Sequence, residues 1–219
     1  MTLGWRSGLD LDWAFDLVSG DPQVREAALR RHAALQERHA DAQRRVAELS
    51  SRTGTPWPAE PHLAADMDQR LSAVGDAGQY LLLHTVAEWV RGGEDRLLPY
   101  ALLYLEWEAG YPQEWVKDWR LKAKVLRGFA QLPEHPEWLA ARLRALVVSA
   151  VLTTRGCENR WYVPLARAVH DSGLRARLRA IEATEESPEA RVKAQYLGHM
   201  LDHPEFPATV STWRDWLRA

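Results

Sequence analysis

The chain has 219 residues, of which 46% are hydrophobic and 26% charged, and its formal net charge at pH 7 is −2. This is the composition of an ordinary globular protein and not of a disordered one. Because the net charge is slightly negative, the protein as a whole is not drawn electrostatically to nucleic acid or to an anionic membrane.

Length and cysteine content predict one cytoplasmic domain. A chain of this size can bury roughly 70% or more of its surface, so residues 1–219 are expected to form a single domain, with two domains as the alternative. Cys157 is the only cysteine, which excludes an internal disulfide and is typical of a reducing compartment. Residues 1–6 do not begin a signal peptide, and the longest apolar run, residues 145–152, is too short to span a membrane. We therefore expect a cytoplasmic protein without membrane contact.

Arginine accounts for 24 of the 28 basic residues, and isoleucine and asparagine occur once each, as Ile181 and Asn159. Lysine, isoleucine and asparagine have AT-rich codons, so this bias is typical of a GC-rich genome. The arginine count is therefore not taken as the sign of a phosphate-binding surface.

Helical periodicity runs through nearly the whole chain, and no stretch alternates as a half-buried strand does. The pattern predicts an all-α fold of about eleven helices, with the apolar segment at 136–152 as a central, buried helix. The expected helices lie at 9–18, 22–51, 63–75, 77–91, 95–109, 112–132, 136–152, 160–171, 174–184, 188–202 and 207–218.

One short pattern occurs near both ends, at Asp21–Ala28 and at Ser187–Ala194. In each copy a capping residue precedes a proline, and an arginine and an alanine follow three and six places after that proline. The capping side chain can accept a hydrogen bond from the free amides of the first turn, and proline fits where no amide hydrogen is needed. Each pattern therefore predicts the start of a helix.

The two segments resemble the start of the second helix in HEAT repeats, which are stacked helical hairpins. This resemblance implies an irregular α-α superhelix of about five hairpins, in which Arg25 and Arg191 bond to a neighbouring turn. It also implies a groove lined by second helices. Those helices are expected around 22–36, 77–91, 112–131 and 188–202. Because a period of about 40 residues does not show in the middle of the chain, an irregular helical bundle is the alternative.

No motif in the sequence indicates catalysis or a metal site. His199 and His203 are four residues apart, which suits a shared metal, but the sequence assigns no third ligand. The run from His170 to Ser172 contains the residue types of a hydrolytic triad, but contiguous residues cannot easily converge, and Ser172 is instead expected to cap a helix. We expect no catalytic residue, no metal and no cofactor.

The chain holds eleven tryptophans. Those on apolar faces are expected in the core, namely Trp13, Trp89, Trp107, Trp138 and Trp161. Trp57 lies between two prolines in a connector and is expected to be partly exposed. Tryptophan next to arginine is typical of interface hot spots. The candidate binding residues on these grounds are Trp57, Trp115, Asp118, Trp119, Arg120, Trp213 and Trp216.

The expected function is that of a non-catalytic binding or scaffold module that presents a helical groove to a protein or peptide partner. The alternative is an enzyme. Residues 115–120 resemble the Trp, Asp and Arg set with which HEAT-like alkylpurine DNA glycosylases hold a damaged base, and this resemblance implies action on alkylated bases. The spacing departs from the family's motif, and DNA binding needs a basic stripe that a slightly acidic chain does not suggest. A nucleic-acid partner is therefore not expected.

Overall fold

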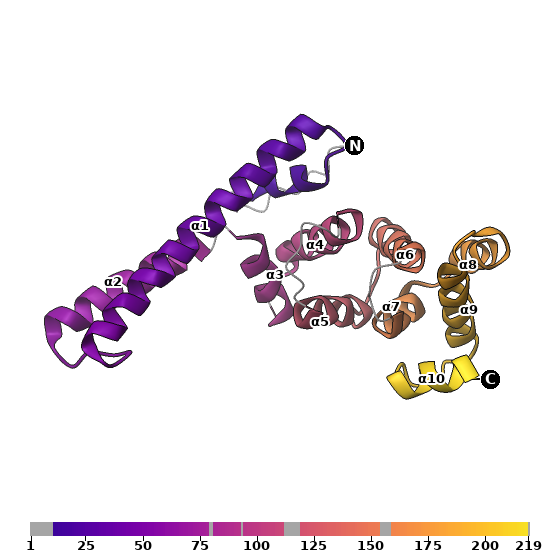
Figure 1. Cartoon of the computed structure of the whole chain (residues 1–219). Coiled ribbons are helices and arrows are strands. Elements are labelled where there is room, and N and C mark those ends of the chain that lie inside the picture. Colours follow the sequence, from indigo (N-terminus) through magenta and orange to yellow (C-terminus); the bar gives the residue numbers. More distant parts are fainter. Residues whose placement is uncertain (1–10, 79–80, 93, 112–118, 154–158, 219) are drawn as a thin grey trace. The chain divides into compact units, whose positions relative to one another are not determined.

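The computed structural model describes residues 11–78, 81–92, 94–111, 119–153 and 159–218 (Figure 1). Over these ranges the chain is all-α, as predicted, with ten α-helices, three short 3-10 helices and no strand. The α-helices are α1 (Pro22–Thr53), α2 (Pro61–Gly78), α3 (Leu82–Val90), α4 (Leu98–Gly110), α5 (Trp119–Ala130), α6 (Glu137–Leu152), α7 (Tyr162–Val169), α8 (Ser172–Thr184), α9 (Pro188–Asp202) and α10 (Val210–Arg218). The 3-10 helices are η1 (Asp12–Val18), η2 (Asp95–Leu97) and η4 (Asn159–Trp161).

The chain divides after Tyr104, within α4, into two compact units. Unit 1 runs from Met1 to Tyr104 and unit 2 from Leu105 to Ala219. The expected single domain and the HEAT-like superhelix both stay predictions. Of the helices within the described ranges, none is both long and apolar enough to cross a membrane.

Unit 1 is built on a hairpin of α1 and α2. α1 begins where Asp21 Oδ1 accepts hydrogen bonds from the amides of Gln23, at 2.9 Å, and Val24, at 3.5 Å, with Pro22 in the first turn. It ends at Gly54, whose φ of 68° is the left-handed conformation that glycine adopts freely. The repeated sequence pattern therefore starts a helix at this end of the chain, as predicted.

The hairpin packs along a heptad-like seam. On each helix a row of buried or half-buried side chains recurs at alternating steps of four and three residues, the spacing of helices that pack along their length. The row on α1 is Ala28, His32, Leu35, His39, Ala42, Val46, Leu49 and Thr53, and the row on α2 is Leu63, Met67, Arg70, Val74 and Ala77. α2 continues past Gly75 to Gly78, so the predicted helix end at Gly75 is wrong.

Unit 2 centres on α6 and α7. α6 buries one broad face, which carries Leu139, Leu143, Val147 and Val151, and it contacts α7, α8 and α9. The prediction of a central, buried helix at 136–152 is confirmed for this face only, because Ala141, Ala145 and Leu152 on another face are exposed. A buried ion pair joins Lys122 of α5, whose side chain is 6% exposed, to Glu108 of α4.

Arginines of unit 2 tie helix ends to their neighbours. Arg144 of α6 donates a hydrogen bond to the Val169 carbonyl at the end of α7, at 3.4 Å. Arg175 of α8 donates to the Leu201 carbonyl near the end of α9, at 3.2 Å, and Arg167 of α7 also bonds to the end of α9. The last carbonyls of a helix have no partner within it, so a cation satisfies them and also complements the helix dipole.

Candidate functional site

The strongest candidate for a functional surface lies on the last three helices of unit 2. α9 begins with the second copy of the repeated pattern: Ser187 Oγ accepts a hydrogen bond from the Ala190 amide at 3.3 Å, and Pro188 occupies the first turn. α8 begins at Asp171, whose carboxylate accepts from the Leu174 amide at 2.7 Å. The cap of α8 is therefore Asp171, and the prediction that Ser172 caps this helix is wrong.

A groove of about 280 Å³ runs between α8 and α9. We call it the α8–α9 groove. Its lining residues are Arg175, Leu178, Arg179, Glu182, Ala194, Gln195, Gly198, His199 and Asp202. On the α9 side two of the lining residues are small, namely Ala194, which is 1% exposed, and Gly198 one turn later, where an added Cβ would meet no other atom within 4 Å. The groove therefore has room for another chain to approach α9 closely at Gly198.

Polar side chains from both helices line this groove. Near the α9 C-terminus Arg175 forms an ion pair with Asp202, and this hydrogen-bonded guanidinium lowers the pKa of the Asp202 carboxyl. Farther along, Gln195 Nε2 donates to Glu182 Oε1 at 3.2 Å. Arg179 lies between these two contacts, is exposed and forms no ion pair within the described residues. The groove therefore offers one free guanidinium to a bound carboxylate.

Next to the groove, six rings form a continuous row that we call the aromatic strip. Its members, in order of contact, are Phe206, His203, His199, Trp216, Trp213 and Tyr196, and neighbouring ring centroids are 4.5 to 6.3 Å apart. His199 belongs to both the strip and the groove. The two surfaces therefore join at one residue of α9.

Tyr196 is the buried end of the strip. Its ring is fully buried under Trp213 and Trp216, with centroid distances of 4.5 and 5.4 Å. Its hydroxyl has no hydrogen-bond partner among the described residues, and burial raises the pKa of this phenol. A buried hydroxyl without a partner is costly, so it lowers the stability of the packing around Tyr196.

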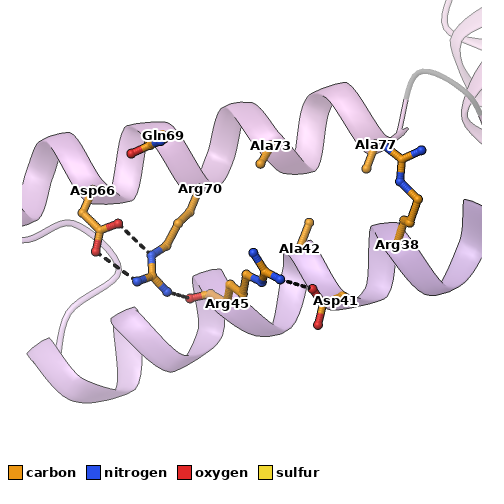
Figure 2. A pocket seen from close by; sticks show the side chains of 9 residues that line it. All are labelled: Arg38, Asp41, Ala42, Arg45, Asp66, Gln69, Arg70, Ala73 and Ala77. Atoms are coloured by element: carbon orange, nitrogen blue, oxygen red, sulfur yellow. Dashed lines mark hydrogen bonds and ion pairs between the residues drawn. The ribbon is translucent and has the colours of Figure 1, made fainter.

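A second groove, of about 530 Å³, lies on unit 1 between α1 and α2 (Figure 2). Arg70 spans it, donating to both carboxylate oxygens of Asp66 at 2.9 and 3.1 Å and to the Arg45 carbonyl at 2.7 Å. The hydrogen-bonded guanidinium of Arg70 lowers the pKa of Asp66, and Asp41 pairs with Arg45 at 2.8 Å. Four of its five charged side chains pair with one another, and Arg38 forms no ion pair within the described residues.

The structure brings together two of the candidate binding residues that the sequence indicates. Trp213 and Trp216 stack at 5.6 Å between centroids. Trp57 is 59% exposed, as predicted, but belongs to unit 1. Arg120 is exposed at the start of α5. Trp115 and Asp118 lie outside the described residues, as does the side chain of Trp119.

Sequence reasoning missed the residues that surround this tryptophan pair. Tyr196 and Phe206 complete the strip, while Gly198 and Arg179 shape the groove. Tyr196, His199 and His203 recur at steps of three and four along the chain, and this spacing could have indicated a ring-bearing face of α9.

The histidine pair and the triad-like run also find places in the structure. The His199 and His203 rings are 4.5 Å apart between centroids, and His203 Nδ1 lies 3.0 Å from Glu205 Oε1. Among the described residues, no three histidine, cysteine or acidic side chains lie together in a group that could hold a metal ion. In the triad-like run, the Asp171 carboxylate caps α8 and pairs with Arg144 at 3.2 Å, which is a structural role.

No protein-family model, no curated protein and no solved structure matches this chain. A functional proposal therefore rests on the geometry and chemistry of the surfaces described above.

Proposed function

We propose that this chain is a non-catalytic binding module whose α8–α9 groove holds a helical segment of a protein partner. The observation that carries the proposal is the combination of an open position on α9, at Gly198, with a guanidinium that has no ion-pair partner in the described residues, at Arg179, in one groove. A helix laid in a groove needs close approach along its length, and small side chains permit that approach.

The charges of the groove indicate which partner residues fit. Arg175 and Asp202 neutralise each other, whereas Arg179 has no counterion within the described part of the chain. A carboxylate on the partner, placed opposite Arg179, would form a charge-assisted hydrogen bond. The adjoining strip supplies tryptophan rings, and tryptophan is the residue type most enriched in interface hot spots.

The test selects peptides that bind the full-length protein from a displayed random library and measures their affinities by fluorescence anisotropy. Gly198→Trp fills the groove from a position where the new Cβ meets nothing. Gly75→Trp is the matched control, because Gly75 is also helical and also has open space around it, but lies in α2.

We expect Gly198→Trp to lower the affinity of the protein for the selected peptides at least tenfold, and Gly75→Trp to leave that affinity unchanged. We also expect Arg179→Gln to weaken those peptides that carry an acidic residue. Selected peptides that bind Gly198→Trp as tightly as the unmodified protein would contradict the proposal.

A further inference from the structure

Among the described residues, ring contacts join α10 to the rest of unit 2, and no hydrogen bond or ion pair does so. Trp213 and Trp216 touch Tyr196 and His199. The hydrogen bonds and ion pairs of residues 209–218 are all local, such as Thr212 N to Thr209 Oγ1 at 3.1 Å, and none of them reaches another helix of the described chain. Ring contacts do not depend on a particular donor and acceptor. Another helix that carries aromatic residues can therefore form the same contacts in place of α10.

The surface beneath α10 is, by contrast, firmly fixed. Arg167 of α7 donates to the carbonyl oxygens of Met200 at 2.9 Å, His203 at 2.9 Å and Phe206 at 3.0 Å. One guanidinium thus holds the end of α9 and the first residues after it. The C-terminal end of α9 is therefore held in place, and α10 is a separate helix that follows it in the chain (Figure 1).

α10 covers Tyr196 fully but is itself partly exposed. None of its residues is buried, although Tyr196 beneath it is fully buried. Its apolar residue Leu217 is 52% exposed, and Trp213 and Trp216 are half-buried. Since hydrophobic stabilisation grows with the apolar area removed from water, these partly exposed side chains hold α10 less strongly than fully buried ones would. α10 also leaves the Tyr196 hydroxyl without a partner.

We infer that the face of α9 formed by Tyr196 and His199 is a docking site for amphipathic helices with two aromatic residues three positions apart, and that α10 is its displaceable, autoinhibitory occupant. The pair Trp213 and Trp216 has this spacing and shows how such a helix seats. A partner that adds a hydrogen-bond acceptor for the Tyr196 hydroxyl gains a contact that α10 lacks, and so displaces it. This inference goes beyond the proposed function, because it holds whether or not the α8–α9 groove binds a partner.

The test uses the full chain and a defined probe, a fluorescein-labelled peptide of residues 207–219. In the unmodified protein, α10 competes with the probe at an effective concentration on the order of millimolar, because it is tethered next to the site. In the full-length double variant Trp213→Ala with Trp216→Ala, α10 lacks the two rings that contact α9, so it no longer competes with the probe. We expect the probe to bind the double variant at least tenfold more tightly than the unmodified protein. A probe peptide that carries the same two alanine substitutions should bind neither protein.

A second measurement does not depend on any variant. Amide hydrogen exchange of the unmodified protein reports local opening, and we expect α10 to exchange at least a hundredfold faster than the middle of α9. Equal probe binding by the two proteins, binding of the alanine peptide, or α10 amides as protected as those of α9 would each overturn the inference. Loss of selected-peptide binding in Gly198→Trp concerns the α8–α9 groove alone, so the two proposals fail separately.

Discussion

The Tyr196 ring meets Trp213 nearly edge-on, with 85° between the ring planes and 4.5 Å between the centroids. This geometry is favourable for aromatic pairs, yet the Tyr196 hydroxyl beside it has no hydrogen-bond partner within the described chain. The Tyr196 ring therefore contributes favourable packing, whereas its hydroxyl is a buried polar group without a partner.

We predict that Tyr196→Phe stabilises the protein by about 1 kcal/mol, because it keeps the ring and removes a buried polar group without a partner. Urea unfolding followed by circular dichroism measures the change. Burial raises the pKa of Tyr196, so the folded chain binds this proton more tightly than the unfolded chain does. Stability is therefore lost as pH rises above about 10, the ordinary value for tyrosine. This alkaline loss should be smaller in Tyr196→Phe, and an equal loss would contradict the assignment.

Replacing two of the glycines by alanine, one at a time, should change the stability of the protein in opposite directions. Gly198 is helical with open space around its Cβ position, so Gly198→Ala should stabilise the protein by about 0.5–1 kcal/mol through higher helix propensity. Gly54 has φ of 68°, which an alanine adopts only with strain, so Gly54→Ala should destabilise it by about 1 kcal/mol. Thermal unfolding of the two variants side by side checks both signs. A loss of stability in Gly198→Ala would show that its surroundings are more crowded than described.

The two arginines of the repeated pattern form a matched pair. Arg25 Nε donates to the Leu17 carbonyl at 3.2 Å, so the predicted bond to a neighbouring turn is confirmed. Arg191 is exposed and makes no such bond in the described residues, so the prediction is wrong for Arg191. We expect Arg25→Met to cost about 1 kcal/mol and Arg191→Met to stay within about 0.5 kcal/mol of the unmodified protein. Chemical denaturation of both variants provides the comparison, and equal effects would contradict it.

Unit 1 should lose stability in mild acid. His32 is 6% exposed, and burial lowers its pKa. The pKa of His84 is lowered by burial and then by the nearby positive charges of His39 and Arg91. The unfolded chain therefore binds more protons than the folded chain below about pH 6.5, the ordinary histidine value, and stability falls as pH falls below it.

Hydrogen exchange at pH 7.5 and pH 5.5, corrected for the intrinsic rate, measures this effect in α1 and α3. His84→Gln should reduce the loss of protection, while His62→Gln, at an exposed position of α2, is the control. Protection in α1 and α3 that does not change between the two pH values would rule out the histidines as the cause.

Much of the fold follows from local signals. The positions of most helices and the buried face of α6 follow from periodicity, and the starts of α1 and α9 follow from their capping residues and prolines. Trp89 and Trp107 are buried as predicted, at 8% and 3% exposure, but Trp138 is 36% exposed because it lies in the first turn of α6. Apolar periodicity assigns a face to the whole helix and does not show how far along its length a neighbour covers that face.

The candidate site could be predicted only in part. Trp213 and Trp216 stand out by composition, but their contact with Tyr196 depends on how α10 folds back onto α9. Likewise, whether Arg175 or Arg179 is neutralised depends on the alignment of α8 against α9, which places Asp202 beside Arg175. These relationships are set by tertiary packing, and no local spacing in the sequence contains them.

The bond from Arg70 to the Arg45 carbonyl sets the register of the unit 1 hairpin. A seam that repeats every seven residues keeps nearly the same apolar contacts when one helix slides along the other by a whole repeat. Asp66 holds the Arg70 guanidinium from within α2, and the carbonyl it reaches belongs to one particular turn of α1. Sliding would abandon that carbonyl, so a single polar side chain selects one alignment among several with similar hydrophobic contacts. The same alignment fixes the span between the two helices, and with it the position at which the connector presents Trp57.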